Sequence, residues 1–137
     1  MNYKCIMIPT DGGASSEEVI ELVCSMQNVT KSAIQIIYIV EIPRNLSLGT
    51  IIPEKVESAK AALYKAQQIA EKYGVVVSTS TVYARTSEDT IISTSEELKC
   101  DVIAIAQDNQ KLRIFSNMAL NINQRAKCNV WIFNNKL

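Results

Sequence analysis

The chain has 137 residues, of which 47% are hydrophobic, enough for one well-filled core, so we expect a single domain over residues 1–137. Basic and acidic residues number 14 each, and this formal charge of zero argues against binding to nucleic acid or to an anionic membrane. No apolar run approaches the ~20 residues that cross a bilayer, and no signal-peptide pattern opens the chain, so we expect a cytoplasmic protein.

The chain contains no histidine, which excludes Ser-His and Cys-His nucleophile pairs and an imidazole base. No carboxylate cluster takes the place of that base, so we predict no catalytic residues and no enzyme, with weak nucleotide hydrolysis left open. The cysteines lack the spacing of a metal site, so we predict no bound metal and buried, reduced thiols, with a redox role as the alternative. These cysteines are Cys5, Cys24, Cys100 and Cys128.

The first half of the chain predicts two strand-helix units. An apolar strand over residues 3–9 ends at a Thr-Asp-Gly-Gly turn, and Ser15 and Ser16 are expected to cap a helix that reaches about residue 28. A second apolar strand, residues 33–40, is followed by an irregular segment. The next helix runs from Pro53, a residue suited to the first helical turn, to Gly74.

The second half predicts two further units and a closing strand. Residues 75–83 alternate for part of their length, as in a strand near a sheet edge with one solvated face, and a helix follows from Ser87 to about residue 99. An apolar strand over residues 101–106, a helix from about 116 to 126 and a strand over 129–133 complete the order. Alternation of strands and helices implies a parallel sheet with helices on both faces.

Four segments carry a resemblance to a known family. Met7–Gly12 (MIPTDG) is similar to the first strand and turn of the universal stress proteins, and residues 37–40 (IYIV) resemble their second strand. Residues 99–105 (KCDVIAI) resemble the fourth strand, and residues 126–133 (AKCNVWIF) the closing one. The chain therefore resembles a UspA-like universal stress protein over essentially its whole length. The resemblance implies a Rossmann-like, adenine nucleotide alpha hydrolase-like α/β fold, with a five-stranded parallel sheet in the order 3-2-1-4-5.

In nucleotide-binding members of that family, ATP or AMP lies where the strand order reverses, a usual place for ligands in open sheets. The resemblance implies that Asp11 contacts the nucleoside, although an aspartate before glycine also commonly caps a turn. The glycines of the family's phosphate motif fall on other residues here. The candidate nucleotide crevice consists of Pro9, Thr10, Asp11, Val40, Ala106, Asn109, Ser116 and Asn117.

The altered phosphate motif predicts that the chain is not a strong ATP binder and has no cofactor. Backbone that wraps a phosphate usually needs glycine, and Ala106 carries a methyl group where the backbone would approach the phosphate. The loop is also three residues shorter than the family's. The alternative is an ATP- or AMP-binding protein with a remodelled loop, in which Lys111 and Arg113 supply positive charge near a helix N-terminus.

The last strand is apolar and uncharged, and in the family this strand commonly pairs with its two-fold mate. An apolar edge strand is a liability unless it is paired, so we expect a homodimer, with core packing under helices as the alternative explanation. The interface is expected to contain Val130, Trp131, Ile132 and Phe133. The apolar loop Asn45–Ile52 is expected to act as a lid or as a second dimer contact.

The function implied by the resemblance is that of a dimeric regulatory or protective binding module in the stress response, with an unidentified protein as a further partner. An enzyme on the same fold and a response-regulator-like or flavin-binding domain lack support. Asp11 stands alone where a regulator needs paired acids, and the first turn is too short and too poor in hydroxyls to hold a flavin phosphate.

Overall fold

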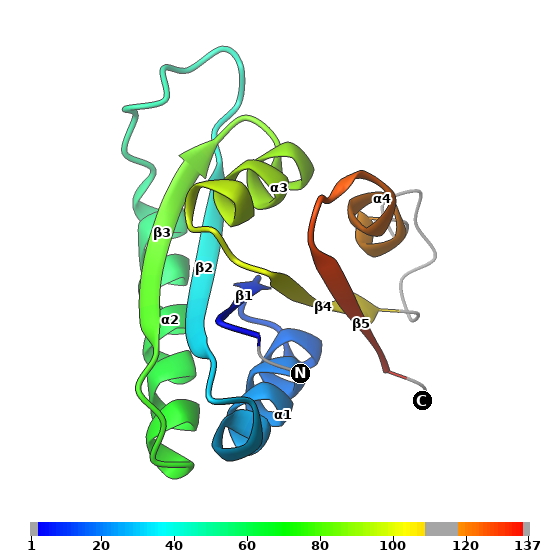
Figure 1. Ribbon diagram of the computed structural model, residues 1–137. Coiled ribbons are helices and arrows are strands. Elements are labelled where there is room, and N and C mark those ends of the chain that lie inside the picture. The colour runs from blue at the N-terminus through cyan, green and yellow to red at the C-terminus, as the bar shows by residue number, and fades with distance from the viewer. Residues whose placement is uncertain (1–2, 109–117, 136–137) are drawn as a thin grey trace.

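The computed structural model describes residues 3–108 and 118–135, with a strict alternation of strands and helices (Figure 1). The elements are β1 (Cys5–Thr10), α1 (Ala14–Thr30), β2 (Ala33–Glu41), α2 (Pro53–Lys72), β3 (Ser78–Ala84), α3 (Ser87–Glu97), β4 (Val102–Asp108), α4 (Met118–Arg125) and β5 (Asn129–Asn135). The strands form one parallel sheet in the order β3-β2-β1-β4-β5. This confirms the predicted fold class and strand order.

Helices α1 and α2 cover one face of the sheet and α3 and α4 the other (Figure 1), with a hydrophobic core under each pair. Alternate residues of β1 point to opposite faces, so Ile6 and Ile8 pack toward α1 and α2, whereas Met7 packs toward α3 and α4. All three side chains are fully buried. None of the helices in the described part of the chain is long and apolar enough to cross a membrane.

Several element boundaries differ from those expected from the sequence, among them the starts of α1 and β3. Helix α1 begins at Ala14, with Gly13 at the N-cap, because the hydroxyl of Ser16 is used by the preceding turn instead of capping the helix. Strand β3 begins at Ser78, three residues later than predicted. It lies at one edge of the sheet and is only half-buried, as its alternating sequence predicts.

The structure contradicts the prediction that all four cysteines are reduced. Cys5 and Cys100 form a disulfide, while Cys24 and Cys128 remain free. The pair is separated by 95 positions in the chain. The pairing follows from the fold, because β1 and β4 are neighbours and both cysteines stand where these strands begin.

The pairing between β1 and β4 is the shortest in the sheet. Strand β1 is paired with β2 along its whole length, but with β4 only at Ile6–Val102 and Met7–Ile103. Beyond these pairs β4 continues along β5 to its last residue. The sheet therefore opens between the carboxyl ends of β1 and β4, where the strand order reverses.

At the other end of this pairing, where β1 and β4 begin, the carboxylate of Asp101 joins the two segments by hydrogen bonds. Asp101 accepts hydrogen bonds from the backbone N–H groups of Lys4 and Cys5, both at 2.8 Å. Burial raises the pKa of Asp101, but these hydrogen bonds outweigh it, so the pKa lies below its usual value. The charged form is thus the one that fits the folded protein.

We predict that Asp101→Asn lowers the free energy of unfolding by about 1–2 kcal/mol at neutral pH, because the two N–H groups bond to different carboxylate oxygens and asparagine replaces one of these with an NH₂ group. The native pKa is depressed, so the stabilisation is present above about pH 4 and is lost as pH falls through the native pKa. Urea unfolding at several pH values checks this, with the exposed Glu57→Gln as control. A difference between variant and wild type that persists unchanged at pH 2 would contradict the assignment.

Candidate functional site

The turn after β1 is held by hydrogen bonds between neighbouring residues. The N–H of Gly12 donates to Oγ1 of Thr10 at 3.1 Å. Oδ1 of Asp11 accepts from the N–H of Gly13 at 2.8 Å and from the hydroxyl of Ser16 at 2.9 Å. Asp11 therefore caps the turn, one of its two predicted roles, while its side chain stays exposed at the carboxyl edge of the sheet.

Helix α2 packs against the same turn from the other side. Gly12 has a φ of +81°, and a Cβ placed on it would lie 3.1 Å from Cβ of Ala62. Both the left-handed backbone and the close approach require glycine. The turn is thus fixed between α1 and α2, which holds Pro9, Thr10 and Asp11 at the end of β1.

Val40 lies near the end of β2, as predicted, but its side chain belongs to a small core. It is 2% exposed and packs with Ile42 and Ala59, with Tyr38 and Ile52 at the border of the cluster. The whole residue, backbone included, is thus buried in this structure. The place of Val40 in the candidate nucleotide crevice stays a prediction.

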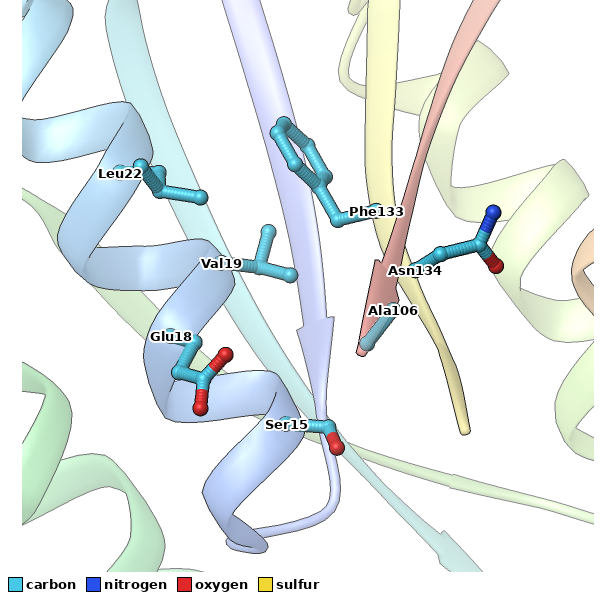
Figure 2. A pocket seen from close by; sticks show the side chains of 7 residues that line it. All are labelled: Ser15, Glu18, Val19, Leu22, Ala106, Phe133 and Asn134. Atoms are coloured by element: carbon cyan, nitrogen blue, oxygen red, sulfur yellow. The ribbon is translucent and has the colours of Figure 1, made fainter. Parts of the chain in front are cut away.

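Ala106 lines a shallow cleft between α1 and the ends of β4 and β5 (Figure 2). The cleft encloses about 340 Å³ of empty space, part of it open to solvent. Its lining consists of Ser15, Glu18, Val19, Leu22, Ala106, Phe133 and Asn134. Among these lining residues Glu18 carries the only charge, and Pro9, Thr10, Asp11 and Val40 are not part of the lining.

The contribution of α1 to this cleft was not predicted from the sequence. Ser15, Glu18 and Leu22 lie three and four positions apart, a spacing that puts them on one face of a helix. This spacing was the available signal, but only the fold shows that the face lies beside β4 and β5. Phe133, predicted at a dimer interface, also lines the cleft.

Three predicted site residues, Asn109, Ser116 and Asn117, lie outside the described residues. Lys111 and Arg113, the predicted source of positive charge, lie in the same segment. Within residues 3–108 and 118–135, no group of three histidine, cysteine or acidic side chains could hold a metal ion.

Strand β5 is the outermost strand on its side of the sheet. Val130 and Ile132 pack on the α3–α4 face, and Trp131 and Phe133 pack on the α1–α2 face, which confirms the predicted alternation. Trp131 also meets the ring of Tyr3 edge-on, with 5.3 Å between the ring centroids. The large side chains of β5 are thus used in core packing. Pairing between two copies would therefore depend on backbone hydrogen bonds along the outer edge of β5.

The segment between β2 and α2 extends beyond the carboxyl ends of the strands (Figure 1). One nitrogen of Arg85 donates to the carbonyls of Pro43 and Leu46, at 2.6 and 2.7 Å, and this attaches the segment to the end of β3. Leu48 and Ile51 are exposed within it. The choice between a lid and a dimer contact remains a prediction.

We predict that Gly12→Ala lowers the free energy of unfolding by about 1–2 kcal/mol, because alanine is strained at a positive φ and its methyl group meets Ala62. Gly49→Ala is the matched control, since no atom lies within 4 Å of the added methyl group. Urea unfolding of both variants measures the difference. Equal stability of the two variants would show that the turn does not need glycine.

Comparison with known proteins agrees with the fold described above. The family model described as "Universal stress protein family" matches residues 2–134. The universal stress protein UspA from Lactobacillus plantarum has a TM-score of 0.78 at 15% identity, with 97% of this chain and 99% of that chain covered. The universal stress protein from Archaeoglobus fulgidus in complex with dAMP has a TM-score of 0.76 at 18% identity, covering 96% and 98%.

A third solved structure, a universal stress protein in complex with cAMP, has a TM-score of 0.76 at 17% identity and covers 98% of each chain. At these identities the structures show a shared fold. None of the curated proteins matches the chain. Because the family model spans nearly the whole sequence, the chain belongs to the universal stress protein family.

Proposed function

We propose that this protein is a cytoplasmic, dimeric binding module of the stress response that regulates or protects through its partners and does not bind ATP strongly. Relatives in complex with cAMP, dAMP and AMP make a nucleotide the first ligand to consider. The observation that carries the proposal is the lining of the cleft at Ala106, the position of the family's first phosphate-loop glycine. There Glu18 stands among four apolar residues, with Ser15 and Asn134 as the polar, uncharged members of the lining.

Electrostatics disfavour a phosphate in this cleft. Of the described residues that line the cleft, Glu18 is the only charged one, and it has the same sign as a phosphate. Two like charges about 4 Å apart repel by about 1 kcal/mol in bulk water and by several times more near a protein surface. The methyl group of Ala106 adds bulk at the same place, and Phe133 offers no hydrogen bond.

The alternative, an ATP- or AMP-binding protein, is favoured by a different observation. The sheet opens between the ends of β1 and β4, and Asp11 lies exposed on the β1 side of that opening. A nucleoside at Asp11 would then need phosphate contacts from Lys111, Arg113 and the helix cap at Ser116, as the sequence predicts.

The proposed role is non-enzymatic. The chain has no histidine to serve as a base. Hydrolysis of a nucleotide would also require firm positioning of the phosphates, which a cleft lined by Glu18 opposes. Weak nucleotide hydrolysis is expected only under the alternative, in which the protein binds ATP or AMP tightly.

We predict no saturable heat when ATP or AMP is titrated into the wild-type protein at millimolar concentration. The double variant Glu18→Gln, Ala106→Gly removes the like charge and the methyl group, and it should bind ATP at least about tenfold more tightly than the wild type, a gain of about 1.4 kcal/mol. Calorimetry measures both proteins.

Asp11→Asn is the control for the alternative, because its amide oxygen can still accept the hydrogen bonds that hold the turn. Micromolar binding of ATP by the wild type, weakened in Asp11→Asn, would overturn the main proposal. It would identify the protein as a nucleotide binder with a remodelled phosphate loop.

We also propose that two copies pair through the free edge of β5. The N–H of Asn129 donates to the carbonyl of Asp101, next to the start of β4. Because successive residues of a strand alternate in direction, the N–H of Asn134 points away from β4, toward the free edge. Its side chain is exposed, so this position can be changed with little effect on the core.

Asn134→Pro should convert a dimer to a monomer, because proline removes a donor from the outer edge and leaves the bonds to β4 in place. Asn134→Ala keeps that donor and should stay dimeric. Sedimentation velocity at several concentrations distinguishes the two. A wild-type monomer at high concentration, or a dimer that Asn134→Pro leaves intact, would contradict pairing through this edge.

A further inference from the structure

The disulfide between Cys5 and Cys100 lies where the two halves of the sheet meet. Cys5 is the first residue of β1, and Cys100 directly precedes Asp101 at the entry to β4. Their Cα atoms lie 4.6 Å apart. The bridge therefore crosses the one strand pair that joins the two halves of the sheet, at the end that Asp101 also closes.

Few other polar interactions join the carboxyl-terminal unit, made of β4, α4 and β5, to the rest of the described chain. The pairing with β1 covers only Ile6–Val102 and Met7–Ile103. Arg125 of α4 forms ion pairs of 2.7 and 2.6 Å with Glu88 and Asp89 of α3. These charges are largely exposed, and exposed ion pairs contribute little and are screened by salt. Apolar packing supplies the rest. On one face of the sheet β4 and β5 pack with α1, and on the other face β4, α4 and β5 pack with α3 and Met7.

We propose that Cys5 and Cys100 form a reversible thiol–disulfide site whose oxidation state sets how readily the unit of β4, α4 and β5 separates from β1. In the oxidised protein a covalent bond holds the unit at the β1–β4 pairing. In the reduced protein that short pairing, the Asp101 hydrogen bonds, the Arg125 ion pairs and side-chain packing hold it. The disulfide lies where β1 and β4 begin, whereas the candidate nucleotide crevice lies at the carboxyl ends of the same two strands.

The chemistry requires a thiol reductant and a disulfide oxidant. A dithiol attacks one sulfur as its thiolate and forms a mixed disulfide, and its second thiol then releases the protein. The products are two protein thiols and a cyclic disulfide, a transfer of two electrons and two protons. Oxidised glutathione carries out the reverse. Cys5 is half-buried and Cys100 is 7% exposed, so Cys5 is the more accessible sulfur.

The other two cysteines are poor competitors for this reaction. Burial, aided by the charge of Glu21, raises the pKa of Cys24 to about 11. Burial also raises the pKa of Cys128, against the opposing effect of its hydrogen bond with Ser95. A thiol reacts as its thiolate, so both react slowly at neutral pH. They provide matched control positions.

The first experiment counts thiols. Wild-type protein equilibrated with oxidised glutathione is unfolded without reductant and alkylated, and its mass should show two of its four cysteines modified. After treatment with dithiothreitol all four should react. Cys128→Ser should still form the disulfide, whereas Cys5→Ser and Cys100→Ser should not. Four free thiols in the oxidised wild type, or glutathione attached to Cys5 alone, would overturn the proposal.

The second experiment is amide hydrogen exchange followed by mass spectrometry on the oxidised and reduced wild type. Reduction should speed exchange in peptides from residues 102–108 and 129–135 by roughly tenfold or more, with little change in β2 and β3. It should also lower the Tm by roughly 5–15 °C. Cys128→Ser should respond to reduction as the wild type does. Equal exchange of the β4 and β5 peptides in both states would overturn the proposal even if the disulfide forms.

Discussion

The short parallel pairing of β1 with β4 is the constraint on which the arrangement of this protein depends. Because the strand order reverses there, β1 is fully paired with β2 and β4 with β5, while the two central strands meet over only two residue pairs. Asp101 and the Cys5–Cys100 bridge close one end of this pairing. The other end opens and places the turn at Asp11 and the end of β4 at Ala106 on its two sides. The proposed ligand site and the proposed redox site thus share the same pair of strands.

The chain keeps the fold of its family, and we propose that its chemistry differs at the expected phosphate position. The turn of Gly12 is fixed between α1 and α2. At Ala106 the lining instead brings together the carboxylate of Glu18 and the ring of Phe133. A fold can host many functions, and the side chains at the site determine which ligand is accepted. Here they disfavour an anion.

The apolar runs and their punctuation allowed the elements to be predicted, because a buried parallel strand must be apolar on both faces, as Ile6, Met7 and Ile8 are. The strand order came from the family resemblance. The disulfide could not be predicted, because Cys5 and Cys100 lie 95 positions apart and only the topology brings them together. The cleft residue Glu18 was missed for the same reason. The start of α1 was misplaced because a serine can bond to a side chain as readily as it caps a helix, and Ser16 bonds to Asp11.

The most direct test of the central claim is an NMR titration of isotope-labelled protein with adenosine, AMP and ATP in turn. If the cleft at Ala106 disfavours phosphate, the amide signals of Asp11 and Gly12 should respond no more strongly to ATP than to adenosine, and the signal of Ala106 should show no saturable shift. Saturable shifts at Asp11 and Ala106 that become tighter with each added phosphate would contradict the account and establish a nucleotide site in this crevice.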